Sequence, residues 1–339
     1  MGVNRLNKLS MTESSNNNLD QLLRTNVLYC TNCLDGLGEI PDKSIDCVIT
    51  SPPYWQQRNY SSQGQMGQEP TIEEYCNNLF HVFDEIGRVL KDSGTCWVNI
   101  GDKYQNQGLL GIPARFELGM RNRGWILINR IVWKKTNAKP ESVKRRFTQD
   151  HEYMFFFVKT KDYYFHQQFE PCKSKPPASR PSSLHRGMQH KLVHPGGQEQ
   201  HYGRNIHYGK MRNVRDTWSI SLVPSSGPHV APYPEELILR PILAGCPPNG
   251  IVLDPFSGSG TTAVVAMQQG RRFIGFEINS EYVAYSYRRL LDHIRDHDNP
   301  LQARRWLFDL AGPVSAPETL LRLRVSDIDW IKRIMSATA

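Results

Sequence analysis

The sequence predicts an α/β protein built on a mostly parallel β-sheet. Apolar, strand-like runs alternate with segments whose apolar residues recur at helical spacing, as in sheets whose strands are joined by helices. One stretch, "NGIVLDPFSGSGTTAVVAMQQGRRFIGFEIN" at 249–279, has the pattern of a complete β-loop-α-β unit. The chain has 339 residues, of which 39% are hydrophobic and 22% charged, so it can bury a large core.

The first half of the chain predicts strands and helices in alternation. We expect strands at 26–30 and 45–50, and then a helix at 71–90, for which Thr71 is the candidate N-cap with Glu74 three residues later. Residues 91–94 ("KDSG") are expected to end that helix before a strand at 95–101. A helix at 112–124, closed by Gly124, and two strands at 125–135 and 151–160 follow.

The last part of the chain repeats this alternation. A helix is expected at 232–247, ending at Gly245, and another at 281–297, after the β-loop-α-β unit. We expect residues 1–25, which are polar, to be a disordered leader, and residues 294–339 to form a helical extension without an assigned function. No apolar run reaches membrane-spanning length, so no membrane contact is expected.

A segment between these two regions carries the positive charge. Residues 159–215 hold eleven Lys or Arg against three Asp or Glu, an excess equal to the net charge of +8 for the whole chain. The segment is also rich in Pro, Ser, Gly, His and aromatic residues. It is either a disordered basic insert or a loop-rich surface that lies on phosphates, and the interleaved aromatic residues favour the second interpretation.

The cysteines indicate a reducing compartment, because seven are scattered without a disulfide framework. Cys30 and Cys33 form a single Cys-x-x-Cys pair with no second pair at zinc spacing, so two ordinary cysteines are a better interpretation than structural zinc. His151-Glu152 lacks the second His of a metalloprotease helix and is expected to be a structural pair at the start of a strand. We expect no metal site.

The β-loop-α-β unit predicts a nucleoside-containing ligand. Asp254 ends its first strand, a turn with Gly258 and Gly260 follows, and Glu277 ends the next strand, where an acid can bind ribose hydroxyls. The Gly-Lys-Ser/Thr ending of a phosphate-binding P-loop is absent. The dinucleotide fingerprint stays open, since Ala263 is tolerated in its third small position, although the Asp-Pro-Phe lead-in and paired threonines favour a ligand without pyrophosphate.

A second motif ends the expected strand at 45–50. In "DCVITSPPYWQQRNY" (46–60) an apolar run stops at Ser51, followed by two prolines and two aromatic residues. Prolines fix the chain and leave backbone carbonyls without a competing N–H.

Together, "TSPPYW" and "DPFSGSGTT" resemble the S-adenosylmethionine-dependent DNA methyltransferases that modify exocyclic amino groups. Their order is that of the β group of this family, with the Ser-Pro-Pro-Tyr motif first, a variable DNA-recognition segment next and the cofactor loop last. The resemblance covers about residues 26–292 and includes "VWKKTNAKPESVKRRFTQDHEYMFFFVK", "RNVRDTWSI" and "GPHVAPYPEEL". It implies a circularly permuted Rossmann-like methyltransferase fold with a catalytic half at 26–159, a loop-rich target-recognition insert at 160–216 and a cofactor-binding half at 217–293.

The resemblance also implies the residues that act. Ser51 and the carbonyl of Pro52, followed by Pro53, would accept the hydrogens of a target amino group, and Tyr54 would stack on a base extruded from the duplex. S-adenosylmethionine would be bound by the residues Asn32, Asp35, Asp254, Phe256, Gly258, Gly260, Thr261, Thr262 and Glu277. Asn32 departs from the family, which has Asp at its position. The candidate DNA contacts in the insert are Arg180, Arg186, Arg204, Lys210, Arg212 and Arg215.

Serine in the first motif position resembles the enzymes that make N4-methylcytosine, whereas aspartate is common in adenine-N6 enzymes. We therefore expect a DNA (cytosine-N4-)-methyltransferase, with the adenine-N6 enzyme as the alternative. A catalytically silent nucleic-acid-binding protein of this fold and an RNA or protein methyltransferase stay open, while a cytosine-C5 enzyme would need Cys172 of "EPCKSK" as nucleophile, far from either motif. Expected partners are duplex DNA and a companion restriction endonuclease, in a prokaryotic cytoplasm beside the nucleoid.

Overall fold

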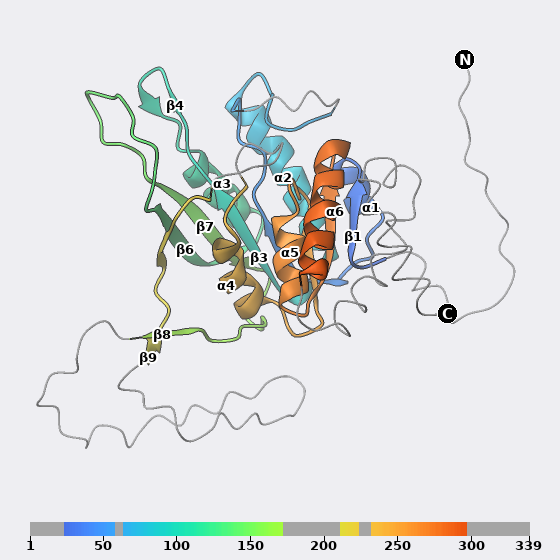
Figure 1. Cartoon of the computed structure of the whole chain (residues 1–339). Helices are drawn as coiled ribbons and strands as arrows, with labels where there is room; N and C mark the ends of the chain where they lie inside the picture. The colour runs from blue at the N-terminus through green and yellow to red at the C-terminus, as the bar shows by residue number, and fades with distance from the viewer. Residues whose placement is uncertain (1–23, 58–63, 172–210, 224–231, 297–339) are drawn as a thin grey trace, which may run out of the picture. The chain divides into compact units, whose positions relative to one another are not determined.

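The computed structural model describes residues 24–57, 64–171, 211–223 and 232–296 (Figure 1). It divides into two compact units, one of residues 167–215 and one of the remaining chain. The leader expected at 1–25 and the extension at 294–339 lie almost wholly outside the described residues. In the described part of the chain, no helix is long and apolar enough to cross a membrane.

The larger unit is built on an eight-stranded sheet in the order β1-β12-β11-β2-β3-β7-β6-β10. Only β7 runs antiparallel to its neighbours, so the prediction of a mostly parallel α/β sheet is confirmed. The strands of this sheet are β1 (Val27–Cys30), β2 (Ile45–Thr50), β3 (Leu90–Ile100), β6 (Ile126–Lys135), β7 (His151–Val158), β10 (Thr217–Ile220), β11 (Ile251–Asp254) and β12 (Arg272–Glu277).

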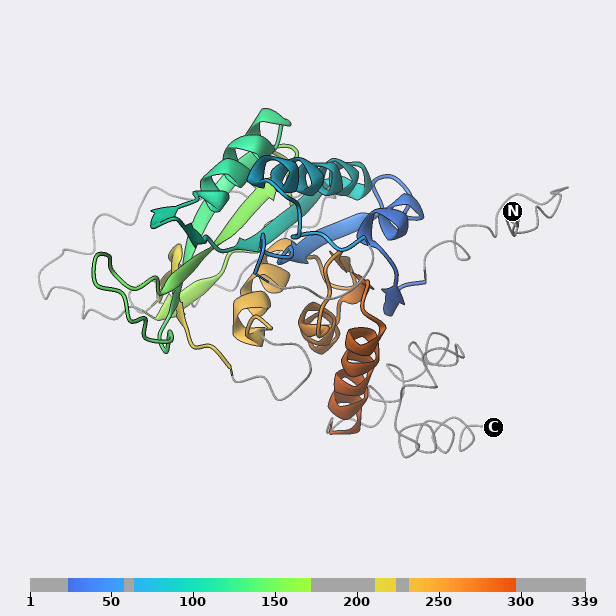
Figure 2. The same cartoon turned by 90° about the horizontal axis from the view of Figure 1, so that it is seen from above.

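Helices cover both faces of this sheet (Figure 2). One face carries α1 (Cys33–Gly38), α2 (Ile72–Val89) and α3 (Ile112–Asn122), and the other carries α4 (Glu235–Gly245), α5 (Thr261–Gln268) and α6 (Ser280–Arg295). The Thr71 hydroxyl caps α2 by accepting the N–H of Glu74, as the sequence predicts. A short hairpin of β4 (Tyr104–Gln105) and β5 (Gly108–Leu109) precedes α3.

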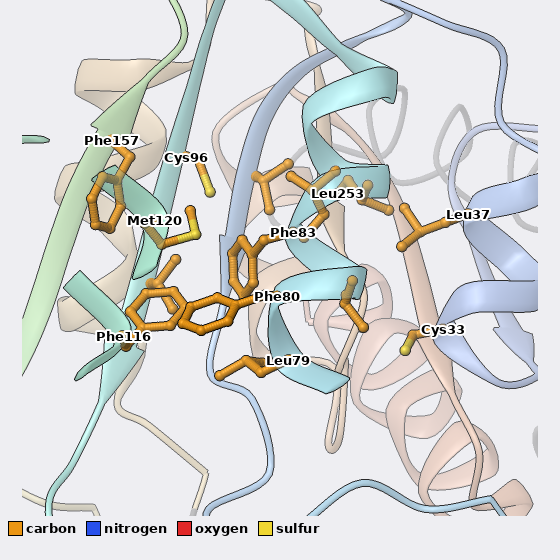
Figure 3. Close-up of a cluster of buried hydrophobic side chains, with 14 of the residues drawn as sticks. Cys33, Leu37, Leu79, Phe80, Phe83, Cys96, Phe116, Met120, Phe157 and Leu253 are labelled. Atoms are coloured by element: carbon orange, nitrogen blue, oxygen red, sulfur yellow. The ribbon is translucent and has the colours of Figure 1, made fainter. Parts of the chain in front are cut away.

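The main core lies between the sheet and the first helical face (Figure 3). Phe83 of α2 and Phe116 of α3 meet edge to face with ring centroids 5.0 Å apart, above Phe157 of β7. The opposite face is also aromatic, because Trp97 stacks on Phe156 at 3.9 Å. The alternation of neighbouring residues between two packed faces explains why these strands are apolar almost throughout.

One prediction was wrong in detail. Residues 91–94, expected to separate α2 from the next strand, belong to β3. They bulge opposite Asp46, since Ile45 pairs with Leu90 and Cys47 with Thr95. Asp46 stabilises the bulge through an ion pair with Lys91 at 2.6 Å and also accepts the N–H of Ile251 at 2.8 Å. It thereby connects β2, β3 and β11.

The smaller unit lies inside the segment expected to recognise the target. Its described residues form a two-stranded ribbon of β8 (Phe169–Pro171) and β9 (Met211–Asn213), in which Arg212 pairs with Glu170 at 2.8 Å. Residues 172–210 lie outside the described residues. Residues 160–166 belong to the larger unit, where Tyr163 and Phe165 pack against Phe156.

We predict that Asp46→Ala lowers the free energy of unfolding by about 1–3 kcal/mol, because it leaves the Ile251 N–H and the Lys91 ammonium without their partner. Urea unfolding measures this loss. Asp46→Asn keeps an acceptor for Ile251 and should lose less.

The control for this prediction is Asp92→Ala, which removes an exposed partner of Lys43 and Lys159 and should change stability little. Equal stability of Asp46→Ala and the wild type would show that the carboxylate does not support the bulge.

Candidate functional site

A cavity of about 660 Å³ opens at the carboxyl ends of the parallel strands. Its walls come from the segments that follow β1, β2, β11 and β12, and from the ends of β3, β6 and β7. Ligands of open α/β sheets bind at this edge, since the loops after parallel strands converge there. The cavity brings Ser51, Pro52, Pro53 and Tyr54 together with Asn32, Phe256, Gly258, Thr261 and Glu277.

The glycine-containing turn at 255–260 forms one wall. Gly258 and Gly260 have φ of 53° and 74°, in the left-handed region, which turns the chain sharply from β11 into α5. Helix α6 fixes the turn, because Ser286 donates to the Gly258 carbonyl at 3.1 Å and Arg289 donates to the Ser259 carbonyl at 2.8 Å. A Cβ at position 260 would lie 2.7 Å from that of Ser286, so glycine is required there by space as well as by φ.

Asp254 lies behind this turn and does not line the cavity. It is 2% exposed, and its carboxylate accepts hydrogen bonds from Thr50 at 2.7 Å, Tyr233 at 2.9 Å and Thr262 at 2.6 Å, as well as from the N–H of Phe256. Burial raises the pKa of Asp254, while the bonds from Thr262, Thr50 and Tyr233 oppose the rise. Asp254, Thr262 and Gly260 therefore shape the site from outside the cavity wall.

Glu277 ends β12 with its carboxylate at the cavity. Its oxygens accept the N–H of Gly258 at 2.9 Å and the N–H of Asn279 at 2.8 Å. Burial raises the pKa of Glu277 to about 7, against the lowering effect of these hydrogen bonds. The carboxylate is thus tied to the glycine turn and can accept further hydrogen bonds from a ligand.

Asn32 and Asp35 differ in their positions. Asn32 is the N-cap of α1: its Oδ1 accepts the Leu34 N–H at 2.9 Å, and its Nδ2 donates to the Gly64 carbonyl at 3.2 Å. Asparagine and aspartate cap helices equally well, so the departure from the family pattern keeps this local geometry. Asn32 lines the cavity, whereas Asp35 is exposed and does not.

The Ser51–Tyr54 segment forms the facing wall. The Tyr75 hydroxyl donates to the Pro53 carbonyl at 2.9 Å, which fixes the double proline against α2. The Tyr54 hydroxyl donates to Glu152 at 2.7 Å, and Glu152 pairs with Lys135. The pKa of Tyr54 is raised well above its usual value by burial first and by the neighbouring Glu152 carboxylate second, so the hydroxyl stays protonated and donates.

Sequence reasoning missed several cavity residues, among them Asn99, Trp133, Lys135, Glu152 and Tyr233. Glu152 is expected from the sequence to form a structural pair with His151. In the structure its side chain lines the cavity and accepts a hydrogen bond from Tyr54. The available signal was that Lys135 ends one expected strand and Glu152 lies at the start of the next. No group of His, Cys, Asp or Glu in the described residues is arranged to hold a metal ion.

The predicted DNA contacts are only partly described. Arg180, Arg186, Arg204 and Lys210 lie outside the described residues. Arg212 is engaged with Glu170 in the smaller unit, and Arg215 is the last residue of that unit.

We predict that Gly260→Ala weakens both the fold and the binding of S-adenosylmethionine, because the new methyl group would collide with Ser286 and displace the turn. Gly270→Ala is the matched control: Gly270 also has a positive φ, of 67°, but nothing lies within 4 Å of an added Cβ.

Both variants carry the cost of about 1 kcal/mol for a left-handed alanine. Only Gly260→Ala should lose a further 1–3 kcal/mol or so in urea unfolding and bind the cofactor more weakly in calorimetry. Indistinguishable variants would show that the turn tolerates displacement.

Comparisons with known proteins agree with this geometry. A family model described as DNA methylase matches residues 45–288. The type II methyltransferase M.SmaI of Serratia marcescens is 33% identical over 314 residues, which cover 84% of this chain and 97% of that protein.

Two solved structures share the fold. The PvuII DNA methyltransferase, named as cytosine-N4-specific, superposes with a TM-score of 0.57 at 23% identity, over 84% of this chain and 92% of its own. A putative DNA modification methylase from Thermus thermophilus, solved with S-adenosyl-L-methionine, gives 0.52 at 23% identity, over 80% of this chain and 96% of its own. The fold is the Rossmann-like methyltransferase fold, and the family match over residues 45–288 means that this chain belongs to the DNA methylase family.

Proposed function

We propose that this protein transfers a methyl group to the exocyclic N4 of a cytosine extruded from duplex DNA. The observation that carries the proposal is the single cavity shared by the Ser51–Tyr54 segment and the Gly258–Glu277 wall. The methyl donor is S-adenosylmethionine, whose sulfonium would supply an activated methyl group for direct transfer to nitrogen. The S–CH3 bond would break as the N–CH3 bond forms, leaving S-adenosylhomocysteine, and one amino proton would be released to solvent. The residues of the chain then have to bind, orient and polarise the two reactants.

The chemistry assigned to the first wall follows from the target amino group. Its lone pair is delocalised into the base ring, so it is a poor nucleophile. The Ser51 hydroxyl and the Pro52 carbonyl are the proposed acceptors of its two hydrogens, which would draw the nitrogen towards tetrahedral geometry and free the lone pair. The prolines hold these acceptors in place before the base arrives, so little reorganisation is needed during transfer.

Tyr54 is the proposed stacking surface for the base. Its hydroxyl is held by Glu152, and a Cβ at Gly101 would lie 3.0 Å from the ring and 3.2 Å from Glu152, which leaves no room for a side chain there. The Tyr54 ring is thus held at its hydroxyl by Glu152 and packs closely against the backbone of Gly101. An aromatic ring that is already ordered loses little conformational freedom when a base stacks on it.

The cofactor is proposed to occupy the opposite wall. The Glu277 carboxylate suits ribose hydroxyls, and the turn with Phe256 and Gly258 gives close approach to the backbone beside Asn32. Asp254, Gly260 and Thr262 do not line the cavity and are proposed to support this wall from behind. Asp35, exposed in the first turn of α1, stays a proposed cofactor contact. Thr261 lines the cavity at the start of α5.

The choice of cytosine N4 rests on serine at position 51, and the PvuII enzyme is a cytosine-N4-specific example of the same fold. Duplex DNA is the proposed partner, with residues 160–216 as the target-recognition region and its arginines and lysines on phosphates or guanine edges. Because M.SmaI is named as a type II methyltransferase, we also propose a role in restriction–modification, with a companion endonuclease, in a prokaryotic cytoplasm.

The decisive experiment digests DNA to nucleosides after incubation with the protein and S-adenosylmethionine, and identifies the modified nucleoside by mass spectrometry. N4-methylcytosine would support the proposal. N6-methyladenine would retain the cavity chemistry and overturn the interpretation of Ser51. The absence of any modified base on several genomic DNAs would overturn the proposed activity.

We predict that Ser51→Ala lowers the rate of methylation by about 100-fold or more, because one acceptor of the target amino group is lost. The affinity for S-adenosylmethionine should stay within about twofold of the wild type, as measured by calorimetry. Ser44→Ala, which removes a hydroxyl bonded to the Pro41 carbonyl outside the cavity, is the control and should keep full activity. An equal loss of turnover and of cofactor affinity would contradict the role assigned to Ser51.

We predict that S-adenosylmethionine binds more weakly as the pH falls through 7. The pKa of Glu277 is about 7, so its carboxylate is mostly ionised at pH 8 and mostly protonated at pH 6. The ionised form accepts hydrogen bonds from the ribose hydroxyls more strongly than the protonated form, and its population falls about tenfold over this range. Calorimetric titrations at several pH values measure the change.

Glu277→Gln should bind the cofactor weakly at every pH and lose most of this pH dependence. Glu281→Gln, an exposed position in the first turn of α6, should keep the wild-type profile. A Glu277→Gln variant with the wild-type profile would assign the titration to another group.

A further inference from the structure

The loop between β6 and β7, residues 136–150, rises from the wall of the cavity. Lys135 is the last residue of β6 and Glu152 the second residue of β7, and both line the cavity. The base of the loop is fixed, because Asn137 exchanges two hydrogen bonds with the backbone of Leu222, a residue that lines the cavity. Figure 1 shows the chain extending beyond the ends of β6 and β7, on the same side as β4.

Arg146 holds this loop in shape. Its guanidinium stacks 3.8 Å from the ring centroid of Tyr104 in β4, and it donates to Glu141 at 2.6 Å and to the carbonyl of Phe147 at 3.1 Å. One side chain therefore connects the loop to the neighbouring hairpin, to the Glu141 carboxylate and to the backbone carbonyl of Phe147. The loop presents its other side chains from a braced backbone.

Phe147 is the unusual residue of this loop, since 95% of its surface is exposed. It is the most exposed of the large hydrophobic residues in the described part of the chain. Lys139, Lys144 and Arg145, on the same loop, are also exposed, and no acidic partner lies within ion-pair distance of them among the described residues. An exposed aromatic ring on the same loop as cations without an ion-pair partner matches the chemistry of a nucleic acid, which offers stacked bases bordered by phosphates.

We propose that the 136–150 loop is a second DNA-contacting element, and that Phe147 stacks in the duplex at the gap left by the extruded base. Extrusion of a base leaves its former partner without a stacking neighbour, and an apolar ring that enters the gap restores that contact. Lys144 and Arg145 lie beside the ring in sequence and would meet the phosphates that flank the gap. This inference rests on the proposed function, because it requires a duplex from which a base is removed.

Extrusion of the base creates both a free base and a gap in the duplex, and the cavity and the loop would each bind one of them. The cavity receives the base through Tyr54, and the loop stabilises the duplex that the base has left. Phe147 lies five positions before Glu152, and the Tyr54 hydroxyl donates to Glu152 at 2.7 Å, so the loop leads directly into the strand that contacts Tyr54.

The test uses the full-length protein on a duplex that carries the site mapped by sequencing the DNA it methylates. Phe147→Ala should methylate a normally paired target about tenfold more slowly, whereas Phe147→Trp should keep most of the activity. On a duplex with an abasic position opposite the target, the defect of Phe147→Ala should shrink to about twofold, because no orphaned base is left for the ring to contact. Leu118→Ala, which removes another exposed apolar side chain (57% exposed) on α3, is the control and should behave as the wild type on both duplexes.

Three outcomes would count against the inference. Wild-type rates for Phe147→Ala on the paired duplex would overturn it while leaving the proposed function intact. An equal defect on both duplexes would assign Phe147 to a general contact, such as a protein partner or the fold, rather than to the gap. A wild-type protein that methylates no DNA would instead overturn the proposed function itself.

A second measurement tests the cations separately. The double variant Lys144→Ala, Arg145→Ala should lower the slope of log K for DNA binding against log salt by about 1.8, the value for two lost phosphate contacts. Lys43→Ala, at an exposed position before β2 whose ammonium pairs with Asp92, is the control and should leave the slope unchanged. An unchanged slope in the double variant would show that the loop does not meet phosphates.

Discussion

The arrangement of the site depends on one buried carboxylate. Asp254, at the end of β11, accepts a hydrogen bond from Thr50, at the end of β2, across 204 positions of sequence. The next residue after Thr50 is Ser51, and the residues after Asp254 form the glycine turn. This bond, together with the parallel pairing of β2 and β11, holds the two sequence motifs at one edge of the sheet and so creates the cavity between them.

The same carboxylate also orders the start of α5. Thr262 and Tyr233 donate to its second oxygen, and the Phe256 N–H donates to the first. Burial alone would favour the neutral acid, and the raised pKa of Asp254 records that cost. Four donors around one carboxylate oppose that cost, which explains how this group is accommodated at a buried position that touches neither proposed reactant.

Features that depend on local sequence could be predicted, whereas features that depend on contacts between residues distant in sequence could not. The N-cap at Thr71, the helix end at Gly124, the β-loop-α-β unit and the parallel sheet follow from short patterns of polarity and from turn chemistry, and the structure has them. The strand over residues 91–94 was missed because the bulge is stabilised by Asp46, a residue distant in sequence that no local pattern reveals. Similarly, the burial of the Asp254 carboxylate against Thr50 and the contact of Glu152 with Tyr54 are set by tertiary packing.

The single antiparallel strand explains why the hairpin serves the site. In a sheet of parallel strands, each connection has to cross back to the opposite edge, so only the carboxyl end of each strand reaches the cavity. Because β7 runs the other way, it begins at the edge where β6 ends, and both Lys135 and Glu152 arrive there. Glu152 holds the Tyr54 hydroxyl and is itself paired with Lys135 of the neighbouring strand, and the connection between the two strands stays beside the cavity instead of passing behind the sheet. A parallel strand in that place would begin at the opposite edge of the sheet, so the position of Glu152 near its start would not reach the cavity.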